Sequence, residues 1–216
     1  MKKKLKAISL SITIFIISIT ISFSVGTFYP NNYIIKKAKA DYQEETIKQW
    51  NNFGLQEPAI EYSNNKEFVI AVSKCVQFIN LSVIPEQRIS RDIIIAMAVL
   101  ETGYGTSRFA NEGNNLFGIR TWDKNVPQLK PLNNSNVEWG VKAYKTKCLS
   151  VKDMISTINN HYAYELFREE RSNQLQTNSI DINKQIELLN KWSTNPTYTD
   201  LVKQKVLSIR KILENA

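Results

Sequence analysis

The stretch that decides the fold is Ile93-Ile94-Ile95-Ala96-Met97-Ala98-Val99-Leu100, an apolar run that ends at Glu101. A helix that is apolar on every side belongs inside a domain rather than on its surface. Ser90 precedes the run as a favourable N-cap residue, and Gly103 follows it at a position suited to a left-handed C-cap. The run therefore predicts a central buried helix that carries one carboxyl group at its end.

Other helices are predicted on both sides of this one. Apolar residues recur at helical spacing in 65–83, where Pro85 ends the pattern. The remaining helices are expected from Thr106 or Ser107 to Asn111, from Ser150 onward, and over Tyr162–Gln174, Ile182–Trp192 and Thr199–Leu213. Residues 116–144 lose the helical period, and two extended arms around 127–136 predict a hairpin or small sheet. The expected fold class is α+β and predominantly helical.

The composition permits one sizeable hydrophobic core, because 43% of the 216 residues are hydrophobic and 22% are charged. The net charge of +8 suggests a polyanionic partner, but its location argues against one. Residues 1–40 hold seven of the 28 Lys and Arg and no acidic residue. The rest of the chain is nearly neutral, so nucleic acid is not an expected partner.

The N-terminus predicts an export segment. Lys2, Lys3, Lys4 and Lys6 precede the apolar residues 7–25, which are long enough to span a hydrocarbon layer of about 30 Å as a helix. Lysines on this side indicate a cytoplasmic N-terminus and an exported remainder. The A-x-A pattern at residues 38–40 lies far from the apolar run, which favours an uncleaved membrane anchor over a cleaved signal peptide.

The expected domains are therefore an anchor or signal segment over 1–40, a polar linker or short peripheral helix over 41–62, and a folded domain over 63–216. Export makes a disulfide between Cys75 and Cys148 possible, and two buried thiols are the alternative. His161 is the only histidine, which argues against Ser-His-Asp, Cys-His and multi-histidine zinc sites. Neither a metal nor a cofactor is expected, and the chemistry falls to carboxylates, tyrosines and amides.

Glu101 is the candidate catalytic residue. Desolvation by its apolar neighbours and the negative end of the helix dipole should both raise its pKa. A carboxyl group that stays protonated near neutral pH can donate a proton to a leaving oxygen. The alternative is an exposed glutamate in the last helical turn, whose side chain only reaches water.

Polar and aromatic side chains that could bind a sugar follow Glu101. The amides of Asn114 and Asn115 either bond sugar hydroxyls or cap their own turn. Aromatic rings on which sugars could stack, although such rings are more often core, are Trp122, Trp139, Tyr144, Tyr162 and Tyr164.

Two motifs together resemble a known family. Ala98-Val-Leu-Glu101-Thr-Gly-Tyr-Gly-Thr-Ser107 and Gly113-Asn-Asn-Leu-Phe-Gly118 resemble the bacterial glucosaminidase domain, glycoside hydrolase family 73, with its Glu-Ser-Gly-Trp-Gly and Asn-Asn-Leu-Phe-Gly motifs. The segment from Asn160-His161-Tyr162-Ala163-Tyr164 to Arg171 is most similar to the family's Bax-like subgroup. The resemblance covers about residues 66–212. It implies a lysozyme-like fold with a β-hairpin beside the cleft.

The same resemblance implies hydrolysis of the β-1,4 bond after N-acetylglucosamine in peptidoglycan, with Glu101 as general acid. The family's second carboxylate lies on the variable hairpin, where Glu138 is the first choice and Asp123 the second. Substrate-binding residues implied by the motifs and by their aromatic neighbours are Tyr104, Asn114, Asn115, Phe117, Trp122, Trp192 and Tyr198.

Several positions depart from the family's pattern. Thr102 replaces Ser and Tyr104 replaces Trp, and both changes conserve polarity or shape. The motif Tyr-Ala-Thr-Asp-Pro-x-Tyr falls on Trp192-Ser-Thr-Asn-Pro-Thr-Tyr198, so Trp192 lacks the phenolic hydroxyl that the family places near the reaction centre.

The expected function is that of an envelope peptidoglycan hydrolase whose partners are glycan strands and, through residues 7–25, the membrane. A lytic transglycosylase is the enzymatic alternative, and a catalytically silent peptidoglycan-binding protein is the other. The sequence predicts no oligomeric state.

Overall fold

The computed structural model describes residues 2–28, 32–134 and 136–215, with the backbone alone for part of the N-terminal region. The chain divides into two compact units, Met1–Gly54 and Leu55–Ala216. The first unit contains helices α1 (Lys2–Phe28) and α2 (Asn32–Asn52). Helix α2 thus covers the end of the predicted anchor segment and much of the predicted linker.

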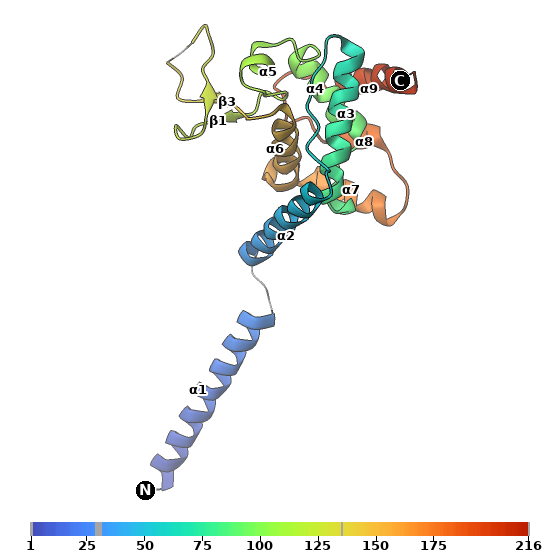
Figure 1. Ribbon diagram of the computed structural model, residues 1–216. Helices are drawn as coiled ribbons and strands as arrows, with labels where there is room; N and C mark the ends of the chain where they lie inside the picture. The colour runs from blue at the N-terminus through green and yellow to red at the C-terminus, as the bar shows by residue number, and fades with distance from the viewer. Residues whose placement is uncertain (1, 29–31, 135, 216) are drawn as a thin grey trace. The chain divides into compact units, whose positions relative to one another are not determined.

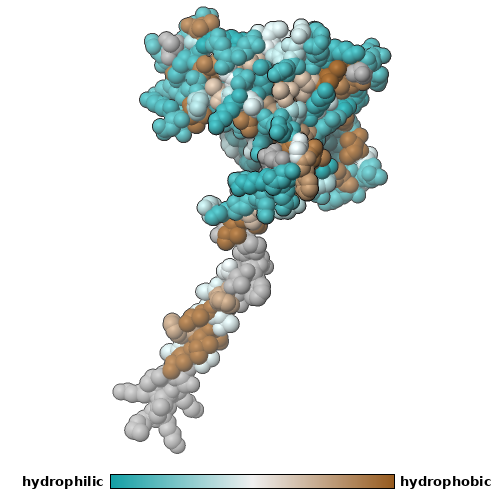
Figure 2. Space-filling model, viewed as in Figure 1, coloured by the Kyte–Doolittle hydropathy of each residue, from teal (hydrophilic) through white to brown (hydrophobic). Residues whose placement is uncertain are grey.

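Hydrophobic side chains are exposed along α1, where Figure 2 shows them gathered. Phe15 and Phe23, for example, are 65% and 68% exposed. Among the residues described, no helix combines the length and hydropathy needed to cross a membrane. The predicted span 7–25 includes residues 7–10, 24 and 25, whose side chains lie outside the described set.

The second unit is mostly helical (Figure 1). Its helices are α3 (Asn65–Ser82), α4 (Arg91–Thr102), α5 (Arg108–Glu112), α6 (Lys147–Asn160), α7 (Glu165–Gln176), α8 (Ile182–Glu187) and α9 (Tyr198–Glu214), with 3-10 turns η1 (Pro85–Gln87) and η2 (Tyr162–Tyr164). The predicted class, α+β with a helical majority, is confirmed.

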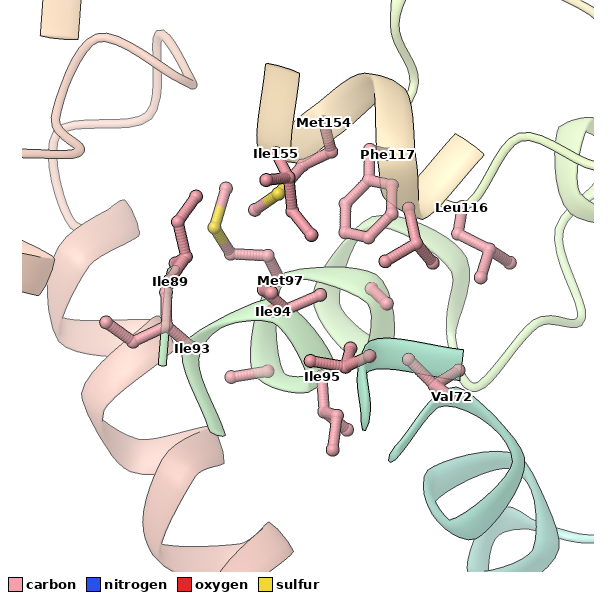
Figure 3. Close-up of a cluster of buried hydrophobic side chains, with 14 of the residues drawn as sticks. Val72, Ile89, Ile93, Ile94, Ile95, Met97, Leu116, Phe117, Met154 and Ile155 are labelled. Carbon is pink, nitrogen blue, oxygen red and sulfur yellow. The ribbon is translucent and has the colours of Figure 1, made fainter. Parts of the chain in front are cut away.

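Helix α4 is the centre of the core, as its sequence predicts. Residues 93–98 are all 0% exposed, and α4 packs against α3 and along α9. In Figure 3, Met97 points toward Met154 and Ile155 of α6, while Ile95 points toward Val72 of α3. Because α4 is surrounded by other helices, its position is fixed, and so is the position of the group at its C-terminal end.

A small antiparallel sheet lies between α5 and α6 in the chain. Its strands β1 (Arg120–Thr121), β2 (Gln128–Leu129) and β3 (Gly140–Lys142) are ordered β1-β3-β2. Arg120 pairs with Val141, and Gln128 pairs with Lys142. The predicted hairpin is confirmed as β2–β3, and β1 adds a third strand on the other side of β3.

Cys75 of α3 and Cys148 of α6 form a disulfide with Cα atoms 5.8 Å apart. Of the two alternatives for these cysteines, the disulfide is the correct one. The largest differences from the predicted helix boundaries are at the start of α6 and the end of α8. Thr146 rather than Ser150 caps α6, because its hydroxyl accepts from Leu149 N, and α8 ends at Glu187 instead of continuing to Trp192.

Candidate active site

Glu101 lies in the last turn of α4. Gly103 ends the helix in the left-handed conformation, with φ 58° and ψ 51°, and its N–H donates to Val99 O at 2.9 Å. This is the C-cap predicted from the sequence. Since the helix stops within two residues of Glu101, the carboxyl group projects from the end of a rigid, buried element instead of from its side.

The turn after α4 is held against α3. Tyr62 donates its hydroxyl to Gly105 O at 2.8 Å, and a Cβ at Gly105 would overlap the rings of Tyr62 and Phe68. Tyr104 also has a positive φ, 61°, and its ring lies edge-on to Phe68 and beneath Lys205. The structure therefore places Tyr104 in packing with α3 and α9, and its described ring contacts do not include Glu101. No sequence pattern marks Tyr62, which lies 43 residues before Gly105.

The Glu101 carboxyl group is partly buried beside two hydrogen-bond donors. Tyr198 donates its hydroxyl to Glu101 Oε1 at 2.9 Å, and the Trp192 side chain lies near enough to the carboxyl group to affect its pKa. Burial raises the pKa of Glu101, and the Tyr198 hydroxyl and the Trp192 side chain partly oppose this rise. The pKa of Tyr198 is itself raised far above its ordinary value by burial and by the Glu101 charge, so its hydroxyl remains a donor.

The other oxygen of the carboxyl group faces the turn that follows α5. A Cβ added at Gly118, which has φ 64°, would lie 3.8 Å from Glu101 Oε2. Glycine at this position keeps the backbone close to Oε2 without a side chain over it. The last residue of the Asn-Asn-Leu-Phe-Gly motif therefore lies beside the Glu101 carboxyl group at the end of α4.

Aromatic rings line one side of the carboxyl group. Trp192 lies edge-on to the buried Phe117, with ring centroids 6.4 Å apart, and is tilted against Tyr164 at 6.1 Å. Burial raises the pKa of Tyr164 to about 12. Of the predicted binding residues, Tyr198 and Trp192 therefore lie beside Glu101, whereas Phe117 is only 2% exposed and packs against Trp192.

The two amides of the motif bond to the chain itself. Asn115 is 0% exposed; its Nδ2 donates to Ile119 O and Lys142 O, and its Oδ1 accepts from the N–H groups of Phe117 and Ile119. Asn114 donates to Tyr144 O at 3.0 Å and to the next carbonyl. These contacts favour the turn-capping alternative, and Asn115 has no exposed surface to offer a sugar.

The remaining predicted residues lie on the β-sheet side. Trp122 is 64% exposed in the loop after β1, and Glu138 is exposed between β2 and β3. Asp123 accepts from Asn125 N in its own turn. Lys130 donates to the carbonyl oxygens of residues 137, 138 and 139, which fixes the backbone that carries Glu138. The hydrogen bond described for the Glu101 side chain comes from Tyr198, and none is described between Glu101 and either Glu138 or Asp123.

Within the described ranges, no group of three or more His, Cys, Asp and Glu could hold a metal ion. The chemistry supported by the site is proton donation from a desolvated carboxyl group beside an aromatic wall. A helical fold with a small sheet, and an acid of this kind at the end of its central helix, are what the motif resemblance implies for a glycoside hydrolase.

The comparisons with known proteins specify the family. The glucosaminidase family, described as mannosyl-glycoprotein endo-beta-N-acetylglucosaminidase, matches residues 82–211. This match covers more than half of the chain, so the protein belongs to that family. It is also similar to Protein bax of Escherichia coli K12, with 33% identity over 88 residues, which are 39% of this chain and 29% of that protein. The match thus spans less than a third of that relative's length.

The fold is similar to that of the catalytic domain of the autolysin Auto from Listeria monocytogenes. The TM-score is 0.50 at 15% identity, over 77% of this chain and 94% of that domain. This likeness supports the lysozyme-like architecture that the motifs imply.

Proposed function

We propose that this chain is a peptidoglycan hydrolase that cleaves the β-1,4 bond after N-acetylglucosamine, with Glu101 as the general acid. The observation that carries the proposal is the desolvated Glu101 carboxyl group, whose pKa is raised at the end of a buried helix. Membership of the glucosaminidase family and the similarity to an autolysin catalytic domain support the substrate class.

The two carboxyl oxygens have different surroundings, which suggests how the acid works. Oε1 accepts from Tyr198, whereas Oε2 lies over Gly118. We propose that the acid proton is carried on Oε2, the oxygen that the backbone leaves uncovered. Transfer of this proton to the glycosidic oxygen breaks the bond to the anomeric carbon, and water adds to that carbon while it gives up a proton to a base.

A second group must assist the water or stabilise the sugar cation. Glu138 is our first candidate, since Lys130 anchors the backbone of its segment, and Asp123 is the second. The substrate's own acetamido group is the alternative, because some glycosidases work by substrate assistance.

The decisive test is Glu101→Gln, which keeps the shape of the side chain and removes its acidity. We expect turnover of purified cell wall to fall at least about 100-fold, the usual contribution of a general acid. Glu86→Gln, at an exposed glutamate of η1, is the matched control and should keep wild-type activity. Unchanged turnover in a folded Glu101→Gln protein would contradict the assignment.

A lytic transglycosylase is the second candidate, because such an enzyme also works with one acidic group. The products separate the two: hydrolysis leaves a free reducing sugar, whereas the transglycosylase leaves an anhydro-sugar. Detection of the anhydro-sugar alone would replace the hydrolase proposal.

A domain that acts on peptidoglycan must lie outside the cytoplasm, in the cell envelope. We propose that residues 1–40 direct this export, since basic residues precede an apolar segment whose Ile and Phe side chains are exposed in α1. Fractionation of cells that express the full chain tests whether residues 7–25 remain attached. Recovery in the membrane fraction supports an anchor, and recovery in the soluble fraction supports cleavage and release.

A further inference from the structure

Four rings form a continuous row that leads from the acid group to the surface. Trp192 lies near enough to the Glu101 carboxyl group to lower its pKa, and the Tyr164 ring centroid is 6.1 Å from that of Trp192. His161 follows at 6.0 Å from Tyr164, and Tyr162 is stacked on His161 at 4.4 Å with an interplanar angle of 28°. Exposure does not change evenly along the row: Trp192 is partly exposed and Tyr164 is only 6% exposed, whereas Tyr162 at the outer end is 81% exposed.

The outer pair is held in place by hydrogen bonds. His161 Nδ1 accepts from Ala163 N at 3.2 Å, which fixes the orientation of the imidazole ring. Arg168 donates to the carbonyl oxygens of His161 and Ile158, both at 2.9 Å, and so ties η2 to the end of α6. In the neutral ring, Nδ1 as acceptor leaves the proton on Nε2, which makes Nε2 a hydrogen-bond donor.

The outer pair, His161 and Tyr162, is more typical of a saccharide-binding site than of a hydrophobic core. A ring as exposed as Tyr162 contributes little to folding through burial. Its flat face, stacked against a fixed imidazole, offers an apolar surface next to a donor and a phenolic hydroxyl. Ligand sites commonly combine aromatic surface with a few fixed polar groups. The apolar C–H face of a sugar and its hydroxyl groups match these features.

We propose that His161 and Tyr162 form an outer binding site for a β-linked N-acetylhexosamine ring of the same glycan strand whose bond is cleaved at Glu101. The proposal rests on the proposed function for the identity of the strand. Its own basis is the chain of ring contacts that places the outer pair near Trp192, and the fixed orientation of that pair. Tyr162 acts through binding alone, at a distance from the reacting bond.

The test compares long and short substrates with the full chain. Tyr162→Ala removes the outer ring, Tyr162→Phe keeps it, and Leu207→Ala is the control at another exposed apolar residue, on α9. We expect Tyr162→Ala to raise KM for long glycan strands about threefold to tenfold, the range of one aromatic contact, with kcat unchanged. The KM for short oligosaccharides should not change, and Tyr162→Phe and Leu207→Ala should resemble wild type.

Binding is measured separately in the inactive Glu101→Gln background, by sedimentation with purified cell wall. Weaker binding in Glu101→Gln/Tyr162→Ala than in Glu101→Gln supports the site even if the wild type proves to have no hydrolase activity. If the wild type turns over cell wall and Tyr162→Ala leaves the KM for long strands unchanged, the outer site is overturned. The proposed function is then unaffected. Equal losses of activity on long and short substrates in Tyr162→Ala also overturn the site. So does a lower melting temperature of this variant that accounts for its loss of activity.

Discussion

At the residue scale, the acidity of Glu101 is set by opposing effects. Burial favours the protonated carboxyl group, whereas the hydrogen bond from Tyr198 and the nearby Trp192 side chain favour the charged form. Burial is the larger effect, so the pKa lies above its ordinary value of 4.5. Trp192 stands where the family's motif has a tyrosine, so the phenolic hydroxyl is missing. Its indole N–H is nevertheless a hydrogen-bond donor near the carboxyl group. An indole N–H can only donate, so we expect it to position Glu101 without accepting a proton.

Removal of one donor should shift the pH dependence in a defined direction. Tyr198→Phe deletes a hydrogen bond that lowers the pKa of Glu101, so this pKa should rise further. Activity requires the protonated acid and is lost as the pH rises through its pKa. The alkaline limb of kcat/KM should therefore move to higher pH in Tyr198→Phe, even if the maximum rate falls because the carboxyl group is less well positioned.

The measurement is a pH profile of kcat/KM for the wild type and Tyr198→Phe, with Tyr42→Phe as the control at an exposed tyrosine of α2. A limb that moves to lower pH, or one that does not move, would falsify the proposed balance of effects on Glu101.

At the element scale, the site is built where short segments are tied together by side chains. Asn115 bonds the loop after α5 to itself and to Lys142 of β3, and Asn114 bonds it to the segment before α6. Local sequence patterns predict the helices well, but they do not predict these hydrogen bonds between segments. The start of α6 is an example, since both Thr146 and Ser150 are plausible caps, and only the contact of Thr146 with Leu149 N distinguishes them.

Asn115→Ala distinguishes the two roles considered for the amide. It would leave buried N–H and C=O groups without partners, so we expect the free energy of unfolding to fall by about 2–4 kcal/mol. Asn111→Ala removes one exposed bond, to Thr106 O at 3.1 Å, and should cost about 1 kcal/mol or less. Denaturant unfolding measures both. Wild-type stability combined with weaker glycan binding in Asn115→Ala would instead support a substrate-binding amide.

At the scale of the whole molecule, the disulfide joins two helices that are far apart in the chain. Cys75 and Cys148 are separated by 73 residues, and this loop includes α4 and the small sheet. In the loop-entropy account, a crosslink of this length stabilises the folded state by about 4 kcal/mol, because it restricts the unfolded chain. The disulfide therefore joins the two ends of the segment that carries Glu101.

Replacement of both cysteines by alanine should lower the free energy of unfolding by about 2–4 kcal/mol. Alanine avoids placing a hydroxyl in positions that are 0% and 2% exposed. Urea unfolding with and without a reductant gives the comparison: the reductant should destabilise the wild type and leave the double variant unchanged. A double variant as stable as the oxidised wild type would show that the crosslink does not contribute.

The sequence by itself determined the buried central helix, the hairpin, the family and the candidate acid, because these depend on local periodicity and on contiguous motifs. Only the tertiary structure decided the disulfide, the internal use of Asn115, and the contact between Tyr198 and Glu101, which are 97 residues apart. The row of rings from Trp192 to Tyr162 also became visible only there. Such contacts depend on how helices pack in three dimensions, and no local pattern of residues encodes that packing.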